Sequence, residues 1–195
     1  MIVVRPVSGE RRTLASARLS LAGGVEGDSW AAGCWMSTED GKPHPDVQIA
    51  IMTTRSIRAV AGEPEYWPLS GNNLFVDLDL SEENMPAGTR LAVGGALLEV
   101  TSQRMTGCKS FIAWYGRDAC VFVNTGEGRK LNMRGVYARV VKDGEVRVGD
   151  RVRKLGRPAG RPAGTGVSGD GRPAGRPYEF GNCLRHPTPD PPNPA

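Results

Sequence analysis

Large apolar residues, which a folded core requires, become scarce in this chain after Leu155. Residues 156–195 instead hold 8 of the 26 glycines and 9 of the 15 prolines, and they repeat Gly-Arg-Pro-Ala-Gly at 156–160 and 171–175. Such a stretch buries too little apolar area to offset the entropy lost on ordering. We therefore expect one domain over residues 1–155, which is long enough for a core, and a disordered tail over residues 156–195.

Short segments that are rich in β-branched residues or that alternate apolar and polar residues dominate this domain and predict β-strands. They run over Ile2–Val7, Ala17–Leu21, Val47–Met52 and Leu74–Leu78. Helical patterns are fewer, and they cover Thr54–Ala61, Lys109–Tyr115 and Asp118–Val123.

Two further segment pairs predict β-hairpins. Gly94-Gly95 is a two-residue turn that permits positive φ, and it would join Arg90–Val93 to Ala96–Val100. Asp143-Gly144 would join Val136–Val141 to Val146–Val152 in the same way. Many short strands, two hairpins and few helices predict a mainly β fold, namely a β-barrel with small helical inserts.

Charge, hydropathy and cysteine spacing exclude several classes of protein. The 20 basic and 18 acidic residues of positions 1–155 nearly balance, so we expect no nucleic-acid partner. No window approaches the ~18 consecutive apolar residues of a membrane span. The first residues also lack the pattern of a secretory signal. We therefore expect no membrane partner and a cytoplasmic location. The four cysteines form no Cys-x-x-Cys pair, which argues against a zinc site or a disulfide framework.

Cys108 is the candidate reactive thiol. It follows Gly107 at the expected start of a helix that Thr106 would cap. The unpaired N–H groups and the dipole of a first helical turn favour a thiolate, and Arg104 and Lys109 add positive charge nearby. The alternative is a buried cysteine that packs as a small hydrophobic residue.

The other cysteines and the two histidines give weaker signals. Cys120 has apolar neighbours and favours core packing, Cys34 lies in a loop that allows either role, and Cys183 lies in the tail. His44 lies between two prolines and His186 lies in the tail, so a zinc or iron site built on imidazoles is not predicted.

Three polar clusters could bind a ligand or could be ordinary surface. Gly71-Asn72-Asn73-Leu74 predicts a turn, with a ligand-binding amide as the alternative. Residues 124–130 form a Gly-rich basic loop without the spacing of a Walker motif. Arg134 stands at the entrance of a strand, where it could bind an anion bidentately or form a surface ion pair.

A set of short motifs resembles the MOSC domain family, which is named for the C-terminal part of molybdenum cofactor sulfurase. The motifs fall in order over residues 15–155, and they are Gly27–Trp30, Gly71–Leu74, Gly94–Thr101, Thr106–Cys108, Arg134–Val140 and Val146–Val152. The resemblance implies a β-rich fold like the barrel domain of pyruvate kinase. It also implies one functional cysteine, which carries sulfur as a persulfide or ligates molybdenum.

The resemblance identifies Cys108 as that cysteine, so we predict it as the catalytic residue and as a candidate molybdenum ligand. The family's asparagine and arginine near this cysteine match Asn73 and Arg134. With Arg104 and Lys109 as additional cations, these four residues are the predicted cofactor-binding residues. The implied cofactor is the molybdenum cofactor, a molybdopterin.

This chain departs from the family pattern in two ways. The common Pro-Cys pair is Gly107-Cys108 here. The chain also shows neither the N-terminal β-barrel of membrane-anchored relatives nor a PLP-binding domain of its own, which predicts a stand-alone domain.

We therefore predict an enzyme of sulfur transfer or of molybdenum-cofactor-dependent chemistry. The expected partners are a PLP-dependent cysteine desulfurase as sulfur donor and a molybdoenzyme or its pterin cofactor as acceptor. The alternative is a non-catalytic module that binds a pterin or another anionic ligand, or that docks on a partner enzyme.

Overall fold

The computed structural model describes residues 1–156, so the expected tail lies outside the described residues beyond Gly156. The strands are β1 (Ile2–Val4), β2 (Arg12–Leu14), β3 (Ser16–Ser20), β4 (Gly24–Val25), β5 (Ile49–Thr53), β6 (Leu74–Val76), β7 (Arg90–Val93), β8 (Ala96–Val100), β9 (Val136–Lys142), β10 (Gly144–Arg147) and β11 (Val152–Gly156). The helices are α1 (Thr54–Ala61), α2 (Lys109–Asn124) and α3 (Gly126–Lys130), with 3-10 helices η1 (Ser29–Ala32), η2 (Pro45–Val47) and η3 (Pro64–Ser70).

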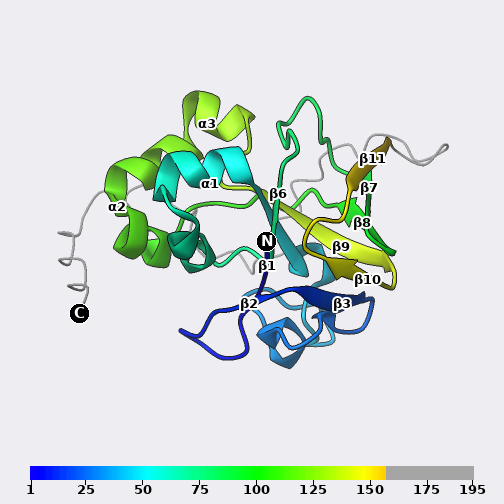
Figure 1. Ribbon diagram of the computed structural model, residues 1–195. Helices are drawn as coiled ribbons and strands as arrows, with labels where there is room; N and C mark the ends of the chain where they lie inside the picture. Colours follow the sequence, from blue (N-terminus) through cyan, green and yellow to red (C-terminus); the bar gives the residue numbers. More distant parts are fainter. Residues whose placement is uncertain (157–195) are drawn as a thin grey trace.

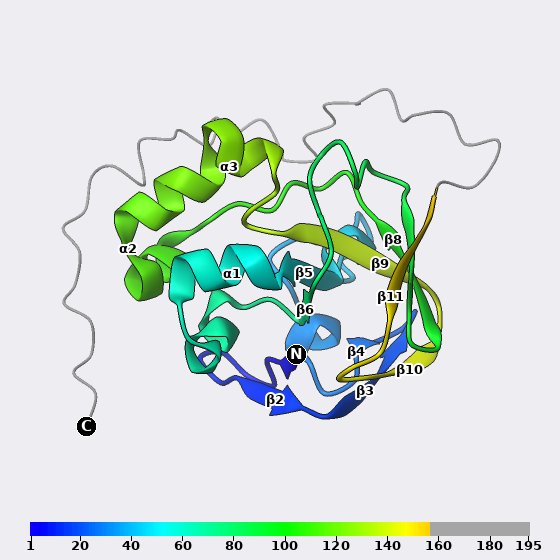
Figure 2. The same cartoon turned by 45° about the horizontal axis from the view of Figure 1, so that its top comes forward.

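The strands form two sheets. The larger has eight strands in the order β11-β7-β8-β9-β5-β6-β1-β2, and the smaller has the order β10-β3-β4. All pairs are antiparallel except β5 with β6. The larger sheet curls, and Figure 2 shows the smaller sheet lying across it, so that the strands enclose an interior.

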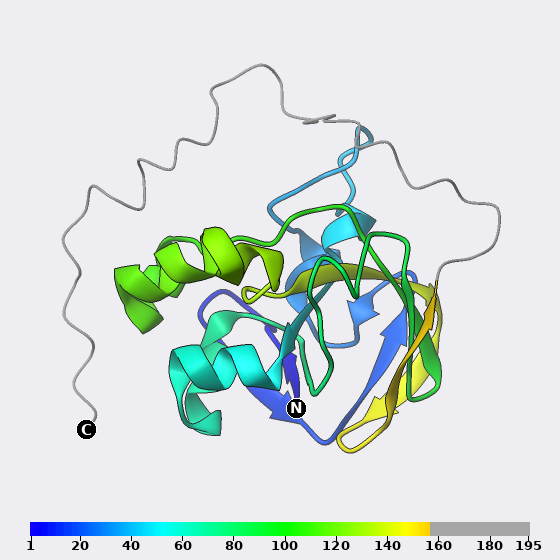
Figure 3. The same cartoon turned by 90° about the horizontal axis from the view of Figure 1, so that it is seen from above.

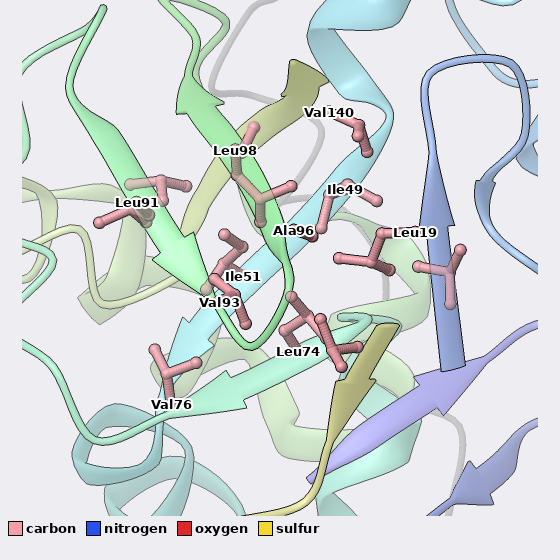
Figure 4. Packing of buried hydrophobic residues seen from close by; sticks show 14 of the residues in the cluster. Leu19, Ile49, Ile51, Leu74, Val76, Leu91, Val93, Ala96, Leu98 and Val140 are labelled. Carbon is pink, nitrogen blue, oxygen red and sulfur yellow. The ribbon is translucent and has the colours of Figure 1, made fainter. Parts of the chain in front are cut away.

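The main core fills this interior with apolar side chains from both sheets. Figure 4 shows Leu19 of the smaller sheet facing Ile49, Leu98 and Val140 of the larger one. Leu19, Ile49 and Leu98 are completely buried. Burial of this kind is the main force that holds the two sheets together. The expected mainly β, barrel-like fold with few helices is confirmed.

A second cluster lies on the outer face of β1, β5 and β6. Adjacent residues of a strand point to opposite faces, so Ile51 enters the barrel core while Met52 packs outside with Ile57 of α1. Trp67 of η3 completes this cluster, with its ring 5.9 Å from that of Phe75. Figure 1 accordingly shows the three α-helices gathered on one side of the molecule.

The helical expectations are confirmed in detail for α1 and α2. Helix α1 covers Thr54–Ala61 as predicted, and the Thr53 side chain caps it by accepting a hydrogen bond from the N–H of Arg55. Helix α2 is broken at Gly116, where φ is +83°, so it consists of the two predicted short pieces on either side of that residue.

One of the two expected hairpins is confirmed and the other is wrong. Strands β7 and β8 form the first hairpin, with Val93 opposite Ala96. The second does not form, because β9 does not pair with β10. Strand β9 lies between β5 and β8, whereas β10 crosses to the other sheet and pairs with β3. The Asp143 carboxylate accepts a hydrogen bond from the N–H of Leu21 at 2.9 Å, so this side chain ties the expected turn to the neighbouring sheet.

The expected Gly-rich loop at residues 124–130 is also wrong over most of its length. Helix α3 covers Gly126–Lys130, with Glu127 in its first turn and Arg129 and Lys130 in its last. These charges complement the helix dipole at both ends. Within residues 1–156, no helix combines the length and apolar character needed to cross a membrane.

Candidate functional site

Cys108 lies immediately before α2 and is exposed. The expected cap was Thr106, but the N-cap residue is Cys108 itself, and its side chain makes no capping hydrogen bond. The preceding residue, Gly107, is buried, and its N–H donates to Oδ1 of Asn124 at 2.9 Å. The end of α2 therefore holds the backbone from which the Cys108 thiol projects.

Gly107 is required here because Cys120 occupies the space that a side chain would need. A Cβ built on Gly107 would lie 2.8 Å from Sγ of Cys120 and 3.4 Å from Phe111. Cys120 is completely buried with Phe111 and Val123, so its expected packing role is confirmed. This contact gives a steric reason for glycine at the position where the resembling family has proline.

Arg134 is a buried cation whose contacts are to neutral groups. It is 8% exposed. Its Nη1 donates to Oδ1 of Asn72 at 2.6 Å, and its Nη2 donates to the carbonyl of Ser70 at 2.9 Å. The guanidinium also lies 4.9 Å from the centre of the Phe111 ring. Its Nε is buried and has no hydrogen-bond partner among the described residues.

Arg134 stands at the entrance of β9, and this position was predicted from the sequence. The strained backbone of the next residue fixes it there. Gly135 has a φ of +104°, and a Cβ there would collide with the carbonyl oxygen of Ile51. Only glycine tolerates both conditions. The β9 strand then begins at Val136 and pairs with β5.

Two more arginines converge on the same turn, residues 70–73. Arg5 donates from Nη1 to the carbonyl of Gly71 at 3.0 Å. Arg11 lies against Gly71, with Nη2 3.9 Å from the position of a Cβ built there. Because Arg134 donates to Ser70 next to Gly71, three guanidinium groups surround one turn. We call Arg5, Arg11 and Arg134 the arginine cluster.

Among residues 1–156, one carboxylate forms an ion pair with this cluster, and it belongs to Asp28. Asp28 Oδ1 lies 2.8 Å from Nη2 of Arg5, and the Asp28 side chain is almost fully buried. Burial acts to raise the pKa of Asp28, but the hydrogen bonds and charge of Arg5 outweigh it and hold that pKa below its usual value.

Arg11 and Arg134 take part in none of the ion pairs formed within residues 1–156. Arg11 donates only to the carbonyl of Glu10, and its buried Nε has no partner in the described part of the chain. Burial, followed by the charge of Arg5, lowers the pKa of Arg11. Within residues 1–156 the cluster thus holds two cations that form no ion pair, although the charge of Asp28 acts on Arg11 from a distance.

The Cys108 thiol and two phenols lie close enough to Arg134 to interact with its charge. Burial lowers the pKa of Arg134, while Tyr137, Cys108 and Tyr115 act to raise it. The guanidinium stays protonated throughout the physiological range. Burial raises the pKa of Tyr137, against the opposing effects of Arg134 and of a hydrogen bond with Trp35. The charge of one buried cation, Arg134, therefore links the exposed thiol and the two protonated phenols in one site.

The remaining predicted residues occupy different places around this site. Asn73 is completely buried and donates from Nδ2 to Asp28 at 3.0 Å, while its Oδ1 accepts from the N–H of Ala50. Arg104 is half exposed and pairs with Glu82 at 2.8 Å. Lys109 is exposed beside Cys108. The cofactor-binding role of Asn73, Arg104 and Lys109 stays a prediction.

The weaker candidates have local roles where the structure describes them. The Cys34 thiol donates to the carbonyl of Met36 at 2.7 Å. Nδ1 of His44 accepts a hydrogen bond from the N–H of Asp46 at 3.1 Å at the start of η2. Cys183 and His186 lie outside the described residues. No group of three or more His, Cys, Asp or Glu side chains within residues 1–156 could hold a metal ion.

Sequence reasoning missed Arg5, Arg11, Asn72 and Tyr137 as members of the site. Asn72 and Tyr137 lie inside the motifs that carried the family resemblance, so they could have been added from those motifs. Arg5 and Arg11 gave no signal, because they lie 66 and 60 positions before Gly71, the residue of the turn that they contact. The pairing of β1 with β6 and with β2 brings these arginines to the site.

A model of the MOSC domain family matches residues 38–153, which is more than half of the chain. Among solved structures, a hypothetical protein is 20% identical with a TM-score of 0.53, over 80% of this chain and 67% of that one. YiiM from Escherichia coli is 21% identical with a TM-score of 0.51, over 80% and 69%. YuaD from Bacillus subtilis is 16% identical with a TM-score of 0.50, over 77% and 91%.

At these identities the solved structures establish a shared fold alone. No curated protein sequence matches the chain closely enough to count as a relative. The family match covers Asn72, Cys108 and Arg134, whereas Arg5 and Arg11 precede it. The chain belongs to the MOSC domain family.

Proposed function

We propose that this protein binds the molybdenum cofactor through its anionic phosphate and pterin part, with Cys108 as a thiolate ligand. One observation carries the proposal. Arg134 is a buried cation without an acidic partner among residues 1–156, and its charge interacts with the exposed Cys108 thiol.

The electrostatics favour an anionic ligand. Buried charges in proteins are nearly always paired, because moving an ion out of water costs on the order of several kcal/mol even after the protein relaxes. Arg134 has only neutral partners, and Arg11 adds a second cation at the same turn. A bound oxyanion would supply the missing negative charge, and guanidinium groups match the geometry of phosphate oxygens.

The donor set also fits the cofactor. A thiolate is a soft ligand of the kind that suits molybdenum chemistry, and Cys108 is the exposed cysteine of the described part of the chain. Bound molybdenum would supply two-electron redox chemistry at the site. This chain would supply the thiolate from Cys108, positive charge from Arg134 and Arg11, and a proton held on the Tyr137 phenol, whose pKa is raised by burial.

Metal and pterin content of the purified full-length protein, expressed with molybdate, tests the proposal. We expect molybdenum and a pterin to copurify with the wild type. Cys108→Ser and Arg11→Gln should lose both, as should Arg134→Gln if it folds. Arg55→Gln is the matched control, because Arg55 makes an exposed ion pair with Asp77, and it should retain both. Equal molybdenum and pterin content in all these variants would overturn the proposal.

The exposure of Cys108 favours sulfur transfer as a second candidate function. The Cys108 thiolate would attack the outer sulfur of a donor persulfide, as on a PLP-dependent cysteine desulfurase. This forms a persulfide on Cys108 and releases the donor thiolate. A molybdoenzyme or its pterin cofactor would then take the sulfur. A mass gain of one sulfur atom that reductant removes, absent in Cys108→Ser, would support this function. If the protein binds an anion but carries neither molybdenum nor added sulfur, the result would support the alternative of a non-catalytic binding module.

A further inference from the structure

Trp35 has the highest exposure of the large apolar side chains within residues 1–156, at 67%. It lies in the segment between η1 and η2, which appears light blue in Figure 3 and extends away from the helices and strands. The segment is held in shape by its own hydrogen bonds. The N–H of His44 donates to the carbonyl of Met36 at 2.9 Å, and Ser37 forms an isolated bridge with Pro43. An indole on an ordered segment that leaves its apolar face in water is suited to cover a ligand.

Trp35 borders the site that contains the thiol and the arginine cluster. Its ring lies 6.5 Å from that of Tyr137, with an angle of 42° between the planes. Tyr137 in turn interacts with the charges of Arg134, Arg5 and Cys108. In the sheet Tyr137 lies opposite Ala50, whose N–H donates to Oδ1 of Asn73, and Nη2 of Arg5 donates to the same oxygen. Tyr137 therefore lies between the exposed indole and the turn that the arginine cluster contacts.

We propose that Trp35 stacks on a flat, fused-ring heterocycle whose anionic group binds the arginine cluster. The anion-binding half of this inference rests on the proposed function, and the ring-binding half rests on Trp35. Indole faces bind planar rings by offset stacking, which is worth about 1–3 kcal/mol for a nucleobase. Neighbouring cations select rings that carry a negative group. Both the pterin of a cofactor and a purine-type substrate have this chemistry.

Titration calorimetry on the full chain with four probes tests the inference. Inorganic phosphate and ribose 5-phosphate report on the cations alone. Adenosine 5′-monophosphate adds a purine to ribose 5-phosphate, and dihydroneopterin monophosphate supplies a phosphate-bearing pterin. We expect the wild type to bind at least one ring-bearing probe about tenfold more tightly than ribose 5-phosphate. The better probe identifies purine or pterin as the preferred ring.

Substitutions separate the two halves of the inference. Trp35→Ala should remove the tenfold gain and leave the affinity for inorganic phosphate unchanged, while Trp35→Phe should keep part of the gain. Trp114→Ala is the matched control, because Trp114 is also exposed, at 47%, and makes no ring contact with Tyr137 among the described residues. It should bind all probes like the wild type.

Phosphate binding without any gain from either ring would overturn the role of Trp35. So would a gain that survives in Trp35→Ala or disappears in Trp114→Ala. No binding of phosphate or of ribose 5-phosphate would instead count against the arginine cluster and therefore against the proposed function.

Discussion

Arg134 and Asn72 are joined by a hydrogen bond of 2.6 Å between two buried side chains that lie 62 positions apart in the sequence. Oδ1 of Asn72 also accepts a hydrogen bond from the hydroxyl of Ser70. The turn at residues 70–73 therefore holds the guanidinium in place, and its charge has no counter-ion among residues 1–156. This relationship makes the charge at the site available to a ligand rather than to an internal ion pair.

Phosphate should stabilise the protein through this charge. A ligand that binds the folded state raises the free energy of unfolding, by about 2.7 kcal/mol at 100 times its dissociation constant. We expect the melting temperature to rise with phosphate, relative to chloride at equal ionic strength. The rise should be lost in Arg134→Gln and retained in Arg55→Gln. Thermal unfolding followed by circular dichroism measures it, and equal shifts in the two variants would contradict the expectation.

The thiols should differ in their rates of alkylation at neutral pH. Cys108 is exposed, Cys34 is half-buried and hydrogen-bonded, and Cys120 is fully buried. We expect iodoacetamide to modify Cys108 first and Cys120 last, as peptide mapping by mass spectrometry would show. In denaturant the three rates should converge, which serves as the control. Faster modification of Cys120 than of Cys108 would remove Cys108 as the working residue.

Gly107→Ala should lower the free energy of unfolding by about 1–3 kcal/mol, the usual range for overpacking. Its Cβ would lie 2.8 Å from Sγ of Cys120. Adding Cys120→Ala removes that sulfur, so the double variant should recover part of the loss. Urea unfolding of the two single variants and the double variant forms a mutant cycle. Strictly additive losses would show that the two positions do not interact.

Stability should fall in acid through Asp28. The pKa of Asp28 is lower in the folded protein than in the unfolded chain, so its contribution is complete above the unfolded pKa of about 3.9. That contribution is lost as the pH falls through the folded pKa. We expect Asp28→Asn to be less stable at pH 7 by about 2–4 kcal/mol and to show a weaker acid dependence. Parallel pH profiles for the two proteins would contradict this.

The sequence predicted elements that are decided by local chemistry. The cap at Thr53 and the helical spacing of the apolar residues Ile57, Val60 and Ala61 define α1. Two glycines define the turn between β7 and β8. The second hairpin could not be predicted correctly, because Asp143-Gly144 has a turn signature whether the next strand folds back or crosses over. The contact of Asp143 with Leu21 decides the outcome, and it joins residues 122 positions apart.

The site was predictable only where local motifs mark its residues, and not where long-range contacts assemble it. Cys108 and Arg134 lie in recognisable motifs, and in the structure the charges of both act on Tyr137. Arg5 and Arg11 carry no motif, and their role depends on how β1 enters the sheet between β2 and β6. No spacing rule connects them to the turn at residues 70–73. The charge of the site is therefore a property of the tertiary structure.

The pairing of β3 with β10 places Ser16 opposite Arg147, near the two ends of the described chain. Contacts of such long sequence separation form slowly, because loop closure must precede the pairing that stabilises it. A growing polypeptide cannot close this barrel until β10 has been synthesised. Until then β3 keeps an open edge, and open edges promote pairing between chains. We expect release of the C-terminal half from the ribosome, rather than formation of the first strands, to set when this domain becomes safe from aggregation.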